Sequence, residues 1–290
     1  MPMLLEGLET LEVLAREGTM SRAATRLFIT QSAVSKRIAN LEHRLGKKLI
    51  EPDGRQVRLT ADARALLLTV APTLGELKGL LFDQLSTVDT TALQIAASET
   101  ILTAYIGPFL QDYMQQDAHL SFASHHTPII VERVRSGDAV VGIGAGQIKI
   151  PPGLSHRILM QEPLILVHHQ PPDYRQRLAC LSIDLSIPSN RHLEPLLLEA
   201  GLDPVMQMNS FFAVAHMGRL GLMPAVIPLG VADIMQIPAS QRFALPIAIE
   251  RPINLLFRPS VYERPRVQRL IDCLQAHFAR SQPSQLKEGI

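Results

Sequence analysis

The stretch from residue 19 to residue 60 decides the fold of the N-terminal part: it contains TMSRAA (19–24), TQSAVS (30–35), LE (41–42) and LG (45–46). Between residues 21 and 60, nine Lys or Arg side chains stand against three acids, a net charge of about +6. The whole chain carries only +1, so the rest sums to about −5. A cationic module within a balanced chain is typical of a DNA-binding domain.

The apolar spacing in this region predicts short helices in succession. Apolar side chains between residues 5 and 15 recur at helical intervals, and Gly18 is expected to end this first helix. Ser21 is a candidate N-cap for a second helix, which carries Ala23 and Ala24. Two small side chains in succession let a crossing helix approach closely.

A third helix is expected to begin at a cap formed by Thr30 or Ser32. Val34, Ile38 and Leu41 form its buried stripe. Its other face carries short polar or cationic groups suited to base edges and phosphates in a major groove: Gln31, Ser35, Lys36, Arg37 and Asn40. A solvated three-helix bundle with incidental charges is the alternative.

Two short strands are predicted after the third helix, at residues 49–50 and 56–59, around a turn at 52–54. Such a β-wing would place Arg55 and Arg58 beside the minor groove or the DNA backbone. The predicted DNA-binding residues are Arg22, Thr30, Gln31, Ser32, Ser35, Lys36, Arg37, Arg55 and Arg58. The predicted partner is double-stranded promoter or operator DNA.

This N-terminal pattern resembles the LysR-type transcriptional regulators. The matching positions are Gly18, Ala23, Ala24, Gln31, Ala33, Val34, Ser35, Ile38, Leu41, Glu42, Leu45, Gly46, Leu49, Arg55, Leu59 and Thr60. The chain departs from the pattern at Ile50, where the family has Phe, and at Pro52, where an Arg is common. The resemblance implies a winged helix-turn-helix, a long linker helix that pairs two subunits, and a two-subdomain effector domain similar to bacterial solute-binding proteins.

Residues 61–85 are predicted to form the linker helix, with a leucine-rich stripe facing a partner helix: Leu66, Val70, Leu74, Leu77, Leu81 and Leu85. The alternative is that the stripe packs on its own chain. Pro72 predicts a kink or irregularity, because an interior proline costs about 3 kcal/mol. Residues 86–91 are predicted to form a hinge.

The remaining two thirds of the chain alternate between strand-like and helical segments, which implies a parallel α/β sheet. Strands are predicted at 93–97, 120–124, 139–143, 162–167, 222–227 and 253–257, with helices after Ser98, at Thr127, at 192–200, at 209–218 and at 264–278. The expected organisation is a DNA-binding domain at 1–60, a linker at 61–88, effector subdomain I at 89–161 with 264–290, and subdomain II at 162–263.

In such a domain a ligand lies between the subdomains, beyond the carboxyl ends of the strands, where helix N-termini converge. The candidate ligand-binding residues are Ser98, Thr100, Thr127, Pro128, Asn209 and Ser210. Each is also explained as a helix cap alone. A small molecule, with a carboxylate as the leading class, is the predicted effector. Glu99 is expected to point outward, because adjacent residues at a helix start diverge by about 100°.

The sequence carries no signature of an enzyme, a resident cofactor or a metal centre. GIGAG (142–146) has Gln147 where a dinucleotide loop needs its third glycine, so it reads as a strand end. Cys180 and Cys273 lack metal spacing and are expected to be incidental thiols rather than a redox disulfide. No run reaches the roughly 18 apolar residues of a membrane span, and no secretory signal is evident, so a cytoplasmic location is expected.

The sequence thus predicts a ligand-responsive, DNA-binding transcription regulator that forms a homodimer or homotetramer. Two other hypotheses remain: a constitutive DNA-binding protein whose C-terminal part serves assembly, and a small-molecule-binding protein or enzyme with an appended helical bundle.

Overall fold

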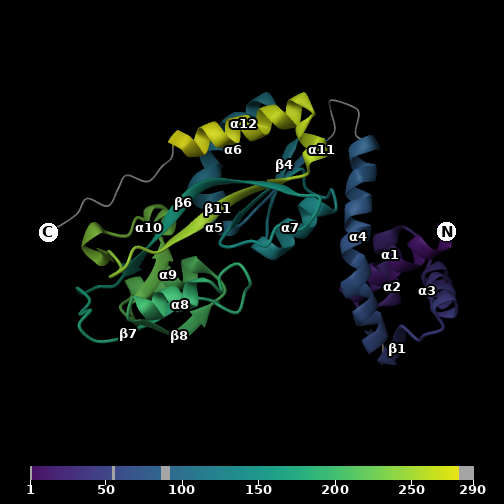
Figure 1. Cartoon of the computed structure of the whole chain (residues 1–290), viewed down its shortest axis with the longest axis horizontal. Coiled ribbons are helices and arrows are strands. Elements are labelled where there is room, and N and C mark those ends of the chain that lie inside the picture. Colours follow the sequence, from purple (N-terminus) through teal and green to yellow (C-terminus); the bar gives the residue numbers. More distant parts are fainter. Residues whose placement is uncertain (1, 54–55, 86–91, 281–290) are drawn as a thin grey trace. The chain divides into compact units, whose positions relative to one another are not determined.

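The computed structural model describes residues 2–53, 56–85 and 92–280, and the chain forms two compact units, Met1–Lys78 and Gly79–Ile290. Each unit is best understood by itself (Figure 1). The N-terminal unit contains α1 (Pro2–Glu17), α2 (Met20–Leu27), α3 (Gln31–Leu45), β1 (Ile50–Asp53), β2 (Gln56–Leu59) and most of α4 (Ala61–Leu85).

The helix boundaries of this unit follow from local chemistry. α1 ends at Glu17, and Gly18 adopts a φ of +72°, a conformation that glycine tolerates without strain. Thr19 caps α2, because its Oγ1 accepts a hydrogen bond from Arg22 N at 3.2 Å. The expectation that Ser21 is this cap was wrong, since the cap lies two residues earlier and Ser21 is already inside the helix, which begins at Met20.

The third helix confirms the sequence prediction. Thr30 caps α3, with Oγ1 accepting from Ala33 N at 3.2 Å. Val34, Ile38 and Leu41 are fully buried in the core of the unit, together with Ala23 and Ala24 of α2. The small alanines therefore lie where the helices pack together, as their size predicts.

The predicted β-wing is present as an antiparallel pair. β1 and β2 run from the pair Ile50–Leu59 to the pair Asp53–Gln56. The first strand is longer than expected, because Pro52 lies within it instead of in the turn. Proline fits this position in a two-stranded ribbon because an edge strand leaves some backbone N–H groups unpaired.

The linker helix α4 spans Ala61–Leu85 as one continuous helix, so Pro72 does not interrupt it, and the kink expected there stays a prediction. A proline removes one backbone donor, and the turns on either side maintain the helix. Leu66, Val70 and Leu74 pack into the core of the N-terminal unit. This half of the predicted stripe is therefore covered by its own chain. The side chains of Leu81 and Leu85 lie outside the described residues.

The C-terminal unit alternates strands and helices. Its elements are β3 (Leu93–Ala97), α5 (Glu99–Ile101), the π-helix η1 (Leu102–Ile106), α6 (Gly107–Gln116), β4 (Leu120–Ser124), α7 (Thr127–Arg135), β5 (Val141–Ala145), β6 (Ser155–Val167), β7 (Leu178–Ile183), α8 (Leu193–Glu199), β8 (Leu202–Met208), α9 (Phe211–Arg219), β9 (Ala225–Pro228), α10 (Leu229–Ile234), the 3₁₀ turn η2 (Ala239–Gln241), β10 (Arg242–Phe243), β11 (Glu250–Phe257), α11 (Pro259–Tyr262) and α12 (Pro265–Arg280).

One sheet runs through the unit in the order β4-β3-β5-β11-β6-β9-β7-β8, with β10 attached to β6. Parallel pairing joins β3 with β4 and β5, and β7 with β8 and β9. The antiparallel strands β6 and β11 lie between these two parallel groups. Two α/β lobes therefore share a pair of crossover strands, and Figure 1 shows α6 and α12 together over the first lobe.

The two lobes have separate cores. On β6, Met160 belongs to the first core and Leu164 to the second. On the other crossover strand Ile253 belongs to the first core, and Ile249, just before the strand, belongs to the second. The second crossing therefore lies inside β11, earlier in the chain than residue 263, where the sequence places it.

The sequence prediction missed β7, β8 and the first half of β6. The last of these has alternating partly buried and exposed residues from Ser155 to Ile158, which gives no continuous apolar run. The run LACLSI at 178–183 was an available signal for β7, whose last four residues are buried.

Candidate functional site

The outer surface of α3 carries most of the predicted DNA-binding groups. Gln31, Ser32, Ser35 and Lys36 are all exposed. Lys36 forms no ion pair with any described residue. An unpaired lysine on an exposed helix face is free to neutralise a phosphate without first breaking a contact in the protein.

Arg37 lies on a different side of α3. Successive helical residues are rotated by about 100°, and this rotation turns Arg37 toward α1. Its Nη2 lies 3.4 Å from Glu6 Oε2, and only 28% of its side chain is exposed. The sequence analysis places Arg37 on the same helix face as Lys36, but in the structure the two side chains lie on different sides of α3.

Two other predicted cations are engaged in exposed ion pairs. Arg22 Nε lies 3.5 Å from Glu17 Oε2, and Arg58 Nη2 lies 3.1 Å from Glu51 Oε2. Such surface pairs contribute about 0–1 kcal/mol and exchange readily for a phosphate. The predicted contact at Arg55 lies outside the described residues.

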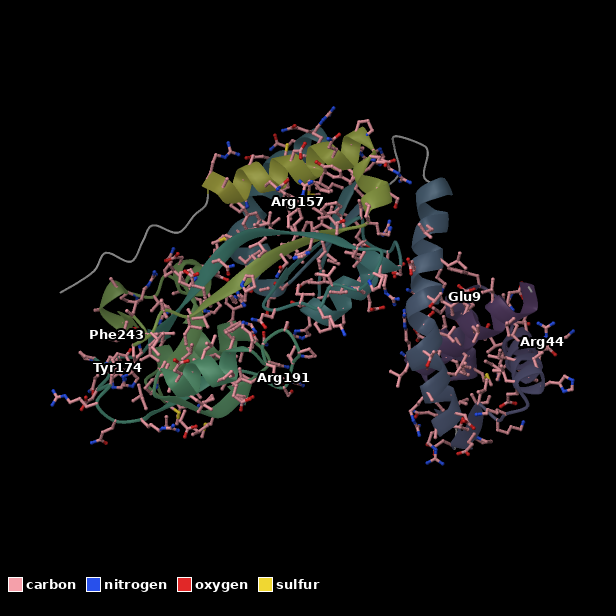
Figure 2. The ribbon with its side chains drawn as sticks, in the orientation of Figure 1. Glu9, Arg44, Arg157, Tyr174, Arg191 and Phe243 are labelled. Atoms are coloured by element: carbon pink, nitrogen blue, oxygen red, sulfur yellow. The ribbon has the colours of Figure 1, made fainter. Side chains whose placement is uncertain are left out.

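Sequence reasoning did not include two further cations on this unit. Arg26 and Arg44 are exposed, and neither forms an ion pair within the described part of the chain. Figure 2 shows Arg44 on the outer side of α3. In the sequence, only the excess of positive charge pointed to these two arginines, because the helix-turn-helix pattern assigns neither of them a DNA contact.

Glu42 fixes the wing to α3. Its Oε1 accepts hydrogen bonds from Leu49 N at 2.8 Å and Ile50 N at 3.3 Å, and its Oε2 accepts from Lys48 Nζ at 3.0 Å. Burial alone would raise the pKa of this carboxyl, but these bonds together lower it below its ordinary value of 4.5. The ionised carboxylate thus determines how β1 leaves α3.

A groove of about 530 Å³ lies between α3 and the wing. Gln31 and Ser35 line it from the helix, and Gln56 lines it from β2. The start of α2, from Thr19 to Ser21, lines it as well. Polar side chains and the backbone N–H groups of a helix start together form a surface that is suited to a nucleic-acid backbone.

A second cavity, of about 430 Å³, lies in the C-terminal unit between the two lobes. It opens where β3, β4, β5, β7 and β8 end, at their carboxyl ends. Five of the six predicted ligand-binding residues line it: Ser98, Thr100, Thr127, Asn209 and Ser210. Pro128 does not, because the second residue of α7 is exposed away from the cavity.

The hydroxyl of Thr127 already has a structural partner. Its Oγ1 donates to Ala145 O at 3.1 Å, and the residue is 6% exposed. His126, not Thr127, holds the N-cap position of α7, although its side chain makes no cap bond. Thr127 therefore joins the helix start to the end of β5, in addition to lining the cavity.

Two polar atoms beside the cavity lack partners in the described structure. Ser98 Oγ and His125 Nε2 are both buried and make no hydrogen bond. Burial, followed by the charge of Arg133, lowers the pKa of His125 below its ordinary value of 6.5. An unsatisfied buried hydroxyl in a cavity wall is costly, and a bound ligand can satisfy it.

Arg251 and Glu162 form a buried ion pair that the sequence did not predict. Arg251 lines the cavity, and its Nε and Nη2 lie 2.8 Å and 2.7 Å from Glu162 Oε2. Nη2 also donates to Thr100 Oγ1 at 3.0 Å, and the guanidinium lies 4.8 Å from the centre of the Phe211 ring. Thr100 belongs to the first lobe and Phe211 to the second, so this one side chain contacts both.

Glu162 is also connected to both lobes. Its Oε1 accepts from Tyr105 Oη at 2.8 Å, on η1, and from Gly230 N at 3.3 Å, on α10. Burial, and then the charge of Glu162, raise the pKa of Tyr105 well above its ordinary value. Tyr105 therefore remains a proton donor. Pro108, two residues after the end of η1, has no N–H group to donate to a regular α-helical bond at this junction.

Glu99 points into the cleft, contrary to the sequence expectation. Its side chain lines the cavity, and its Oε2 accepts a hydrogen bond from Ser210 Oγ at 3.4 Å. The two residues are 111 positions apart and belong to opposite lobes. Ser98 is the N-cap of α5 and Glu99 is its first residue, so both lie at the cavity edge. The rotation between neighbouring helix residues therefore did not turn Glu99 away from the cavity.

Gly146 allows the lobes to approach each other beside the cavity. It follows β5 with a φ of +92°, and an added Cβ would lie 2.1 Å from Ser189 O. The same carbonyl accepts from Gln147 N at 3.1 Å. The sequence interpretation of GIGAG as a strand end is confirmed, and its last glycine serves this close approach.

Neither cysteine lines the cavity or the groove. Cys180 lies in the second core and Cys273 packs against the first, and burial raises the pKa of Cys180 to about 12. Within residues 2–53, 56–85 and 92–280, no His, Cys, Asp and Glu side chains assemble as a set of metal ligands. No helix over the same ranges has the length and apolar content needed to cross a membrane.

Comparisons with known proteins agree with this geometry. Residues 5–64 match the family described as bacterial regulatory helix-turn-helix protein, lysR family, and residues 87–279 match the LysR substrate binding domain. The chain is 42% identical to an uncharacterized HTH-type transcriptional regulator of Vibrio cholerae serotype O1, over 94% of this chain and 96% of that protein. It is 25% identical to a probable RuBisCO transcriptional regulator of Emiliania huxleyi, covering 90% and 91%.

Solved structures share the fold. Full-length OxyR from Pseudomonas aeruginosa superposes with a TM-score of 0.65 at 19% identity, over 94% of each chain. The LysR family regulator CbnR superposes with a TM-score of 0.58 at 21% identity, over 94% of this chain and 98% of that one.

Proposed function

The chain belongs to the LysR family of bacterial helix-turn-helix transcriptional regulators, and we propose that a small molecule in the cleft of its C-terminal unit controls how it acts on promoter DNA. The observation that supports this best is the cavity itself. It is lined by both lobes, and its wall includes Arg251, whose buried pair with Glu162 connects the two crossover strands.

The DNA contacts are assigned to α3 and the wing. Gln31, Ser32 and Ser35 have the polar groups that read base edges, and Lys36 is free to bind phosphate. Arg22, Thr30 and Arg58 supply further backbone contacts. Arg37 and Arg55 remain in the proposed set as well, with Arg37 needing to leave Glu6 before it binds DNA.

The response to a ligand is a shift between two arrangements of the lobes. A molecule that contacts Ser98 and Thr100 on one lobe and Asn209 and Ser210 on the other favours the arrangement in which both sets are within reach. The ligand changes DNA binding only to the extent that it prefers one arrangement. Changing the lobe arrangement alters the spacing of the DNA-binding units when two chains are paired.

Pairing is assigned to the side of α4 that its own unit leaves open. Leu77 is 38% exposed and Leu80 is 50% exposed, and they lie three residues apart on neighbouring positions of the helix surface. Exposed leucines at this spacing suit a partner helix. The proposed assembly is a homodimer or homotetramer, with this part of α4 in the interface.

The test is to map the genomic sites that the protein occupies and the transcripts that change with it. Gln31→Ala should relax sequence preference at one position of the site, at a cost of about 1–3 kcal/mol in cognate binding. Ser210→Trp should fill the cleft, keep site occupancy, and remove the dependence of target transcripts on growth conditions. Ser240→Trp, on exposed η2 away from the cavity, is the matched control.

A Ser210→Trp protein that regulates its targets as the parent does, under every condition in which the parent changes them, would place the effector elsewhere. A Gln31→Ala protein with unchanged affinity and site preference would remove α3 from base recognition.

A further inference from the structure

The cleft contains two side chains of opposite formal charge, which differ in how exposed they are. Arg251 is 3% exposed and lies in the cavity wall, whereas Glu99 is exposed at the cavity. The other lining residues are neutral or are histidines, of which His125 has a lowered pKa caused mainly by burial. The cleft therefore selects a ligand chiefly by how the charged groups of that ligand are placed relative to Arg251 and Glu99.

Arg251 can accept an anion without losing its present partners. Nε and Nη2 are bound to Glu162 and Thr100, but Nη1 has no partner among the described residues. Ser98, two residues before Thr100, contributes a second unsatisfied donor in Oγ. A guanidinium N–H and a hydroxyl in the lining of one cavity match the two oxygens of a carboxylate.

Glu99 sets the opposite requirement. Its carboxylate repels a ligand that carries only negative charge, because Glu162 already neutralises Arg251 and leaves the cleft with a net negative charge. Its present bond to Ser210 is long, at 3.4 Å, and exposed, so a stronger donor displaces it at low cost. An ammonium group has three such donors and forms the shorter, charge-assisted bond.

From these two walls we propose that the effector is a small zwitterion of the amino-acid type, with its ammonium group on Glu99 and its carboxylate on Arg251 and Ser98. This rests on the proposed effector cleft and adds the chemical class of its ligand. The volume of about 430 Å³ lies in the range of small-molecule sites and accommodates a side chain beyond the two charged groups. Glu99 is then the residue that rejects simple carboxylates, and its movement toward the ligand releases Ser210 on the other lobe.

The first test uses the purified full-length chain and matched probes. Each proteinogenic amino acid is added at about 10 mM, and thermal unfolding is followed, because a ligand at about 100 times its Kd stabilises the native state measurably. For each amino acid that raises Tm, the acid lacking the amino group and the amine lacking the carboxyl group are compared. The expected result is that one or a few amino acids raise Tm by several degrees and both truncated analogues do not.

The second test changes Glu99. Glu99→Gln should weaken binding of the active amino acid by about tenfold or more, because it replaces a charge-assisted bond with a neutral one. The same variant should bind the acid lacking the amino group better than the parent does. Glu194→Gln is the matched control, since Glu194 is an exposed acid in the first turn of α8 and does not line the cavity.

The outcomes separate the ligand class from the proposed function. If no amino acid raises Tm, or if a simple carboxylate does so as well as its amino counterpart, the zwitterion is wrong. The cleft as an effector site still stands in that case if Ser210→Trp abolishes regulation. An active amino acid whose affinity is unchanged by Glu99→Gln would overturn the role of Glu99.

Discussion

Arg251 on β11 and Glu162 on β6 stand opposite each other in the strand register, and their Nη2 and Oε2 atoms lie 2.7 Å apart. They sit where both strands pass from the core of one lobe to the core of the other. Tyr105 and Gly230 bind the same carboxylate from the two lobes. A single buried ion pair thus joins the cleft wall to the crossing point of the lobes.

Removing one partner of this pair should be costly. Glu162→Gln leaves the Arg251 charge buried and uncompensated, which typically costs about 3–5 kcal/mol. The double variant Glu162→Gln with Arg251→Met should cost less than the sum of the single variants, because no charge remains unpaired. Urea unfolding followed by tyrosine fluorescence measures this, since all four tyrosines lie in the C-terminal unit and the chain has no tryptophan. Strict additivity would contradict the coupling.

Gly230→Ala should destabilise the same junction. The added Cβ would lie 2.6 Å from Tyr105 Oη and 2.9 Å from Glu162 Oε1, and both atoms are held by their mutual hydrogen bond. Overpacking of this kind costs about 1–3 kcal/mol. Combining it with Tyr105→Phe removes the nearest atom and should recover part of the loss. Gly107→Ala is the control, because its Cβ meets only Leu102 O at 3.5 Å. The readout is again the free energy of unfolding by tyrosine fluorescence.

Glu42→Gln should loosen the wing in a pH-dependent way. The folded pKa of Glu42 is lowered, so its ionised form stabilises the fold above the unfolded pKa and this contribution is lost as the pH falls through the folded value. The variant should therefore lose about 1–3 kcal/mol near pH 7, and the difference from the parent should shrink below a pH of about 4.5. Hydrogen exchange at the Leu49 and Ile50 amides reports it. A difference that stays constant across that range would rule out the carboxylate as the cause.

Lys36→Ala should weaken binding to every DNA sequence alike. Loss of one phosphate contact reduces the slope of log K against log salt by about one. Lys149→Ala is the matched control, because Lys149 is an exposed lysine of the C-terminal unit. Fluorescence anisotropy over a salt series, on a cognate and an unrelated duplex, measures both effects. An unchanged slope would show that Lys36 does not contact phosphate.

Replacing Leu77 and Leu80 together by Glu should dissociate the proposed assembly. The substituted side chains would place charge in an apolar helix–helix seam. Leu68→Glu is the control, because Leu68 is 80% exposed and lies about 180° around the helix axis from Leu77, on another side of α4. Leu74 is unsuitable for this purpose, because it is 6% exposed in the core of its own unit. Analytical ultracentrifugation at micromolar concentration decides the matter. A parent protein that sediments as a monomer would disprove the interface.

The sequence was sufficient to predict those features that depend on a single turn or on one face of a helix. Thr30 before the buried stripe of Val34, Ile38 and Leu41 defined α3, and the paired apolar runs around Pro52 defined the wing. The carboxyl ends of the first-lobe strands then placed Ser98 and Thr127 at the cavity, since parallel strands end on the same edge. These features depend on hydrogen bonds and periodicities spanning only a few residues.

The sequence by itself determined a cationic helix-turn-helix, a long helix and an α/β C-terminal part with its cleft. Only the tertiary structure decided that Arg37 turns to Glu6, that Leu66, Val70 and Leu74 pack on their own unit, and that Glu99 reaches Ser210. It also brought together Glu162 and Arg251, which are 89 residues apart. Such contacts depend on strand register and on the crossing of distant segments, and no local pattern of charge or hydrophobicity specifies them.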